Sequence, residues 1–183
     1  MVVGAERLPV ERLAAAAAEI AAASDLRDAL PLLAAAAVAA TRADLAVLRV
    51  AEPDGTLTAR SVAPPGSALG AELAGSRGPE ATRRAAERTG AAGLLAIPAL
   101  AGGRAVGSVE LVRIGEDFTA EERSLAELVA TQLALAVRSL APDGSTAGGS
   151  RRSRWLELAG DALAAGGAGR RASVEAVRIA VDA

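Results

Sequence analysis

The sequence predicts an α+β fold in which a five- or six-stranded antiparallel sheet carries helices from both ends of the chain on one face. Two pairs of strand-like segments, each joined by a short turn and separated by about thirty residues, predict the sheet, because turn-linked strands pair antiparallel. Helical patterns before the first pair and after the second predict the helices. A packed core is expected, since 51% of the 183 residues are hydrophobic.

The first forty residues are expected to form two helices. The first begins near Pro9, and the second follows Ser24 or Asp25, either of which can cap a helix. Apolar residues at helical spacing are Leu13 and Ile20 in the first helix and Leu26, Leu30, Leu33 and Ala37 in the second. Because proline removes a hydrogen bond from a helix interior, Pro31 favours a second helix that begins nearer Asp28 than Asp25.

A hairpin is expected next. Its strands are Asp44–Val50 and Thr56–Val62, on either side of the turn signature Pro53-Asp54-Gly55. Glycine and proline then punctuate residues 64–93, which are expected to be irregular apart from one short helical piece, Pro79–Thr89.

A second strand pair follows, Leu94–Leu100 and Arg104–Ile114, joined by a turn at Gly102-Gly103. Pro98 fits a strand position where no ladder donor is required. Gly107 permits a bulge or a close approach of another backbone.

A long helix over 119–140 closes this unit. Thr119 and Glu122 have the spacing of a capping box, which fixes where the helix begins. Its apolar side chains are Leu125, Leu128, Val129, Leu133, Leu135, Ala136 and Leu140. This stripe is wider than contact with one sheet requires, so we expect a homodimer built from this helix and the first helix. Leu133 and Leu140 are the candidates for the side that faces the second subunit.

The last part of the chain has a different composition. Residues 141–153 are typical of a linker, and residues 154–183 are expected to form two helices. This pair loosely resembles the first two helices, either because a second, similar domain begins here or because alanine-rich helices resemble one another. We expect the chain to be a fragment of a longer tandem protein, with the tail helices docked on a partner subunit or continuing the closing helix.

The absence of cysteine and histidine excludes several classes of function. A Ser-His-Asp triad, an ordinary zinc site, and cysteine or histidine ligation of haem or a bilin all need these residues, so no cofactor is expected. An enzyme would depend on carboxylates, arginine or unactivated hydroxyls, which makes catalysis improbable. The net charge of −2 and the shortage of aromatic residues argue against nucleic-acid binding. No apolar run reaches the ~20 residues of a membrane span, and no secretory signal is evident, so a cytoplasmic location is expected.

The central part of the chain resembles the GAF domain, a sensory module of bacterial signalling proteins. The stretch that carries the resemblance runs from Leu95-Ala96-Ile97-Pro98 through Gly107-Ser108-Val109-Glu110-Leu111 to Phe118-Thr119-Ala120-Glu121-Glu122. The pattern continues along the closing helix with Leu125, Leu128, Ala130, Gln132, Leu133, Ala134, Leu135 and Ala136. The resemblance covers residues 7–140, and the tail resembles the opening helices of a second GAF domain.

This resemblance implies a ligand pocket on the face of the sheet opposite the terminal helices, roofed by the irregular segment. Because side chains alternate along a strand, Arg49 and, on another strand, Val106, Ser108 and Glu110 are expected on that face. Arg49 and Glu110 are expected to be cross-strand neighbours. They form either a charge pair that lines a ligand site or an ordinary solvated pair on an open sheet face, and the second reading is preferred. Arg49, Ser108 and Glu110 are the pocket candidates.

The resemblance implies a non-catalytic sensory or regulatory module of a bacterial signal-transduction or transcription-control protein, with a possible small-molecule effector. The alternative is a structural dimerisation domain whose pocket has collapsed. Because the roof segment is short and rich in glycine and proline, the pocket is expected to be small or to be filled by its own alanine, leucine and valine side chains.

Overall fold

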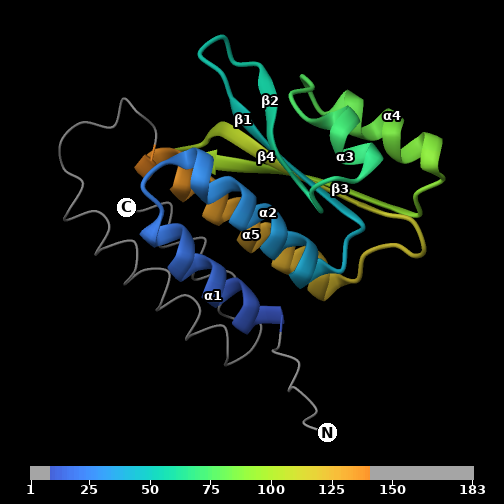
Figure 1. The fold of residues 1–183 in the computed structure, drawn as a ribbon, viewed down its shortest axis with the longest axis horizontal. Helices are drawn as coiled ribbons and strands as arrows, with labels where there is room; N and C mark the ends of the chain where they lie inside the picture. The colour runs from blue at the N-terminus through green and yellow to red at the C-terminus, as the bar shows by residue number, and fades with distance from the viewer. Residues whose placement is uncertain (1–8, 141–183) are drawn as a thin grey trace, which may run out of the picture.

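The computed structural model describes residues 9–140, and the predicted linker and tail helices at 141–183 lie outside the described residues. The elements in chain order are α1 (Pro9–Ala22), α2 (Leu26–Thr41), β1 (Leu45–Ala51), β2 (Leu57–Ala63), α3 (Ala68–Leu73), α4 (Glu80–Thr89), β3 (Gly93–Ala101), β4 (Arg104–Arg113) and α5 (Ala120–Leu140). The α+β class is therefore confirmed, and three layers are visible in Figure 1, with the sheet in the middle.

The sheet has the strand order β2-β1-β4-β3, and all three neighbouring pairs are antiparallel. Four strands are fewer than the five or six expected. Residues 75–78 follow the outer edge of β2 through a single bridge between Thr58 and Arg77, with the Gly78 amide 2.7 Å from the Leu57 carbonyl oxygen. This contact is too short to count as a fifth strand.

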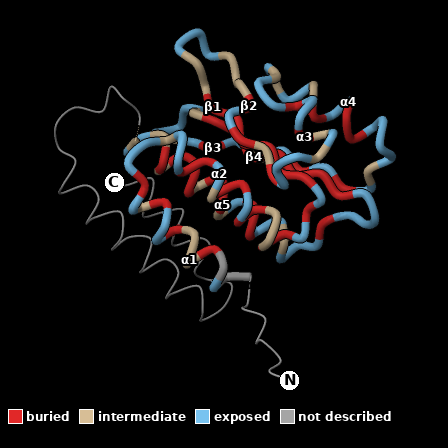
Figure 2. The backbone as a smooth tube through the Cα atoms, viewed as in Figure 1, coloured by how far each residue is buried: buried red, intermediate tan, exposed pale blue. Residues whose placement is uncertain are grey.

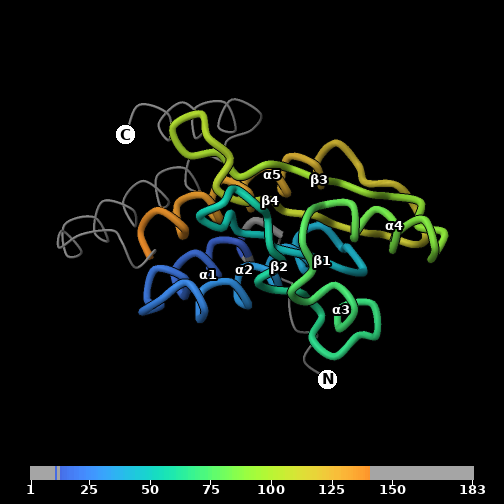
Figure 3. Tube along the Cα trace, turned by 90° about the horizontal axis from the view of Figure 1, so that it is seen from above, coloured from blue at the N-terminus to red at the C-terminus, as the bar shows by residue number. Residues whose placement is uncertain are grey.

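Helices α2 and α5 cover one face of the sheet, and α1 packs on their outer side, mainly against α2 (Figure 1). Figures 1 and 3 both show α1 beside α2, and Figure 2 shows buried residues on the inner sides of these helices and in the central strands. The largest fully buried apolar side chains of this layer are Leu13, Ile20, Leu33 and Leu133, and they form one continuous core with Leu48, Val109 and Leu111 of the sheet. We call this the helix-side core.

The burial of Leu133 corrects one expectation. Its side chain is 0% exposed and reaches towards Gly107 of β4, where a Cβ atom added to the glycine would lie 3.2 Å from Leu133 Cδ2. A second subunit cannot reach this side chain, so Leu133 belongs to the core of the single chain. Leu140, at the end of α5, is half-buried and is left as the candidate for an intermolecular contact.

Helices α3 and α4 lie on the opposite face of the sheet (Figure 1). We call residues 64–92, which include both helices, the roof. A small second core joins the roof to the strands, made of Leu45, Val47, Ala59, Leu73, Ala85, Ala86 and Val112. The expected helix Pro79–Thr89 corresponds to α4, whereas α3 was not expected.

The helix caps explain where α2 and α5 begin. Asp25 caps α2, its carboxylate accepting the Asp28 amide at 2.9 Å, so α2 starts at Leu26 and not near Asp28 as expected. Pro31 lies inside the helix on its exposed side. At α5 the expected capping box is confirmed, because Thr119 and Glu122 each bond the other's backbone amide, at 3.2 and 2.8 Å.

Candidate functional site

The three pocket candidates come together on the roof side of the two central strands. Arg49 of β1 lies directly opposite Ser108 of β4, and Glu110 is two residues further along β4 on the same face. The alternation predicted for β1 is confirmed, since Leu48 packs in the helix-side core and Val47 packs under the roof.

Val106 differs from the expectation. It packs against the helix-side core instead of sharing the face of Ser108. The pairing of β3 with β4 passes from Ala99–Gly107 to Leu100–Ala105, which leaves Val106 as an extra residue. Such a bulge reverses the alternation of side chains beyond it.

Arg49 and Glu110 form a buried ion pair. The Arg49 Nε atom donates to Glu110 Oε1 at 2.8 Å, and the two side chains are 0% and 1% exposed. Ser108 Oγ donates to the same carboxylate oxygen at 3.2 Å. The preferred reading of the sequence, a solvated pair on an open face, is therefore wrong.

The roof supplies the remaining partners of this ion pair. The Ser76 carbonyl oxygen accepts from Arg49 Nη1 at 2.6 Å, and the Ser76 hydroxyl lies 3.2 Å from Arg49 Nη2. Thr82 Oγ1, on α4, accepts from Arg49 Nη2 at 3.0 Å and donates to Glu110 Oε2. We call these five residues, Arg49, Ser76, Thr82, Ser108 and Glu110, the Arg49 cluster.

Sequence reasoning missed Ser76 and Thr82. Thr82 had a detectable signal, because it lies three and four residues before the buried Ala85 and Ala86 and so shares their helix face. Ser76 had none, since it lies in an irregular segment whose path the local sequence does not define.

The Arg49 cluster is chemically self-contained. Two buried charges neutralise each other, and each oxygen of the carboxylate also accepts from a hydroxyl. Removing one partner of such a pair is strongly destabilising, by about 3–5 kcal/mol, because the other charge stays buried. The arrangement can therefore hold β1, β4 and the roof together without any bound molecule.

A shallow cleft of about 290 Å³ lies beside the cluster, between β2 and the first part of the roof. Its walls include Ser61, Val62, Pro64, Gly70 and Ala74. Its one charged residue, Arg60, is exposed and paired with Glu52. The cleft is at the small end of ligand sites and offers mainly backbone and apolar groups.

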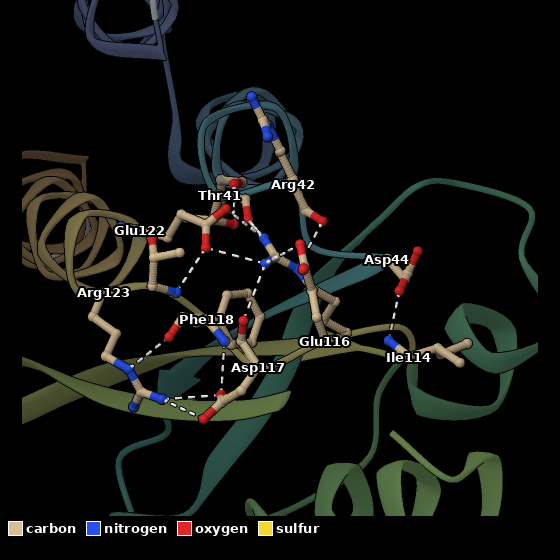
Figure 4. A network of polar contacts seen from close by, with 12 residues as sticks. Thr41, Arg42, Asp44, Ile114, Glu116, Asp117, Phe118, Glu122 and Arg123 are labelled. Carbon is tan, nitrogen blue, oxygen red and sulfur yellow. Dashed lines mark hydrogen bonds and ion pairs between the residues drawn. The ribbon is translucent and has the colours of Figure 1, made fainter. Parts of the chain in front are cut away.

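A second polar network lies on the other face of β4, where the end of α2 meets the start of α5 (Figure 4). Arg113 is its centre and is 4% exposed. Its guanidinium donates to the Thr41 carbonyl oxygen, to the Arg42 carbonyl oxygen at 3.2 Å, and to both carboxylate oxygens of Glu122 at 2.7 and 3.0 Å. It also lies 4.5 Å from the centre of the Phe118 ring.

This network changes the acidity of its members. The hydrogen bond from Arg113, followed by the capping bonds to Thr119, lowers the pKa of Glu122 to about 2, although partial burial opposes the shift. The same bond to Glu122 raises the pKa of Arg113 above its ordinary value. Since Arg113 binds the last carbonyls of α2 while Glu122 lies in the first turn of α5, both charges also suit the helix dipoles.

Within residues 9–140, no group of three or more acidic side chains is placed to hold a metal ion. No helix in the same part of the chain is long and apolar enough to cross a membrane.

Both a family model and several solved structures match this chain. The GAF domain family model matches residues 12–137. A GAF domain of a phosphoenolpyruvate-protein phosphotransferase from Acinetobacter is similar in structure, with TM-score 0.55 and 13% identity over 70% of this chain and 91% of that one. A domain of a putative two-component sensor histidine kinase from Sinorhizobium meliloti 1021 gives TM-score 0.53 and 16% identity over 66% and 96%.

A third similar structure is the bacteriophytochrome RpBphP3 from the photosynthetic bacterium R. palustris, with TM-score 0.54 and 14% identity over 85% of this chain and 47% of that one. A search of curated protein sequences gives no match. At these identities the solved structures support the fold, and the family match over most of the described residues supports the assignment. The chain belongs to the GAF domain family.

Proposed function

We propose that this chain is a non-catalytic regulatory module of a bacterial signal-transduction or transcription-control protein, and that it acts by dimerising without a ligand bound to Arg49, Ser108 and Glu110. The observation that carries the proposal is the Arg49 cluster. It fills the face of the sheet where the family resemblance implies a ligand, and Glu110 and the roof already satisfy Arg49.

Small-molecule sensing is the second candidate, and the cleft beside β2 favours it. The cleft is lined by β2 and the roof, so a molecule bound there contacts both layers. Its lining predicts a small ligand recognised through backbone groups and apolar contact, with little contribution from charge.

For dimerisation, the proposed surface combines the flank of α5 that carries Leu128 and Leu135, the last turn of α5 at Leu140, and α1. Leu128, Leu135 and Leu140 are half-buried on α5, and Ala18 and Ala22 are exposed on α1. Small side chains allow helices from two subunits to approach closely, while the leucines supply apolar area.

Two measurements test the proposal. Light scattering on the full chain at tens of micromolar should give a dimer, and Leu140→Glu should give a folded monomer, whereas the neighbouring exposed change Ser139→Ala should leave the dimer intact. A monomeric parent protein contradicts the proposal. A thermal-shift screen of nucleotides, amino acids and small metabolites should show no stabilisation, and a concentration-dependent rise in melting temperature would favour the sensing candidate.

A further inference from the structure

We propose that the roof is a lid that opens from the sheet as a unit while the helix-side core stays folded, and that its latch is the set of hydrogen bonds that join Ser76 and Thr82 of the roof to the Arg49–Glu110 ion pair of the sheet. The inference goes beyond the regulatory role above, because it concerns a movement within one subunit.

The two faces of the sheet are held with very different amounts of apolar contact. The roof contributes three buried apolar side chains to the small second core, Leu73, Ala85 and Ala86. The helix-side core, in contrast, draws buried residues from α1, α2 and α5 along their whole length. Since local opening is favoured where few apolar side chains are buried, the roof is the part of the described fold that opens first.

The chain has suitable hinges at both ends of the roof. Gly66, before α3, has φ +81°, and Gly90, after α4, has φ +66°. A Cβ atom at either position would meet nothing within 4 Å, so there is free space beside both glycines, although the Gly90 amide also bonds to the Ala86 and Glu87 carbonyl oxygens as the cap of α4. Glycine takes conformations on both sides of φ = 0 with little cost, which lets these positions absorb a rotation of the segment between them.

The Arg49 cluster joins both parts of the roof to the sheet. Arg49 Nη1 holds the Ser76 carbonyl oxygen, which follows α3, and the Thr82 hydroxyl of α4 bridges Arg49 and Glu110. Lifting the roof breaks these bonds and also the backbone bonds that residues 75–78 make with the edge of β2, and it lets water reach Arg49 and Glu110. Hydration of the two charges then partly offsets the bonds lost.

Opening changes what the sheet presents to solvent. Val47 and Val112 lie under the roof, and Val112 is paired in the sheet with Leu94 of the edge strand β3. Leu94 is already 39% exposed, and Leu100, six residues along the same strand, is 55% exposed. The lid therefore controls whether a short exposed apolar strip on β3 extends across the centre of the sheet.

Native-state hydrogen exchange on the full chain, followed by mass spectrometry, tests the lid. Peptides covering residues 68–90 should exchange with one common rate, at least about tenfold faster than peptides from α2 and α5. Thr82→Val keeps the shape of the side chain and removes the hydroxyl, so it should speed exchange across the whole roof by about tenfold or more and change α2 and α5 by less than about twofold. Glu110→Gln should act in the same direction more strongly.

Thr131→Val is the matched control, because the Thr131 hydroxyl bonds to the Glu127 carbonyl oxygen within α5, on the opposite side of the sheet from the roof. It should leave roof exchange unchanged. The lid is refuted if the roof and the helix-side core exchange at the same rate in the parent protein, or if Thr82→Val accelerates both equally. It is also refuted if Thr82→Val leaves roof exchange unchanged. Thr82→Val decides the matter even if Glu110→Gln fails to fold.

Discussion

Replacing Glu122 with glutamine tests how strongly the ion pair with Arg113 fixes the start of α5 against the end of α2. Glutamine can still accept the Thr119 amide, which Glu122 accepts at 2.8 Å, so the capping geometry is preserved. The change removes the negative charge that faces Arg113 through two bonds of 2.7 and 3.0 Å. The loss of stability therefore reports the charge interaction.

The lowered pKa of Glu122 sets an upper limit on the free energy of unfolding that Glu122→Gln can remove. A decrease from 4.5 to about 2 corresponds to at most about 3.4 kcal/mol of stability at neutral pH. The side chains of Arg113 and Glu122 are 5% and 13% exposed, so solvent screens part of the interaction. We expect Glu122→Gln to lower the free energy of unfolding by about 2–3 kcal/mol at pH 7.

The stabilisation by Glu122 should weaken as the pH falls. The folded-state pKa lies below the unfolded value, so the contribution is fully present above about pH 4.5 and is lost as the pH falls towards 2. Urea unfolding followed by circular dichroism at pH 7 and at pH 2.5 should show the gap between parent and variant shrinking at the lower pH. Glu116→Gln is the control, because Glu116 is 78% exposed and 3.7 Å from Arg113, and it should change little. A gap below about 0.5 kcal/mol at pH 7, or one that does not depend on pH, would refute this account.

Three further substitutions probe the packing. Gly107→Ala should destabilise the chain by about 3 kcal/mol in thermal unfolding, because the new Cβ atom would lie 2.5 Å from the Arg49 carbonyl oxygen, and a neutral result would mean that the strands can separate locally. Leu133→Ala should cost about 2–5 kcal/mol without changing the oligomeric state, and a shift from dimer to monomer would show that this residue is at an interface after all. Thr119→Ala should cost about 1 kcal/mol by removing the cap from the Glu122 amide, and no loss would mean that water replaces it.

Much of the fold could be predicted from short-range patterns. The strands of both hairpins and the capping box of α5 were predicted because alternation, turn residues and cap spacing are local signals. The helix α3 was missed because it has six residues, one of them Gly70, and shows no helical period. Val106 was placed on the wrong face because a bulge is invisible to a rule that assumes unbroken alternation.

In the candidate site, the positions of the strand residues could be predicted from the sequence, but their burial could not. Alternation and strand order were enough to bring Arg49, Ser108 and Glu110 onto one face. Their burial depends on Ser76 and Thr82, which lie 27 and 33 residues from Arg49 along the chain. A sequence pattern carries no information on whether an irregular segment folds over a charged pair. The sequence therefore could not distinguish a solvated pair on an open sheet face from a pair buried under the roof.

The position of both ion pairs on β4 has a consequence for how changes combine. Glu110 and Arg113 are three residues apart, an odd spacing, so they point to opposite faces and bind different layers, the roof and the junction of α2 with α5. They share no partner in the described contacts, so the unfolding free-energy losses of Thr82→Val and Glu122→Gln should add to within about 0.5 kcal/mol. A larger deviation in the double variant would show that β4 transmits strain between the two faces. The roof would then be coupled to α5, and opening the lid would alter the position of the closing helix.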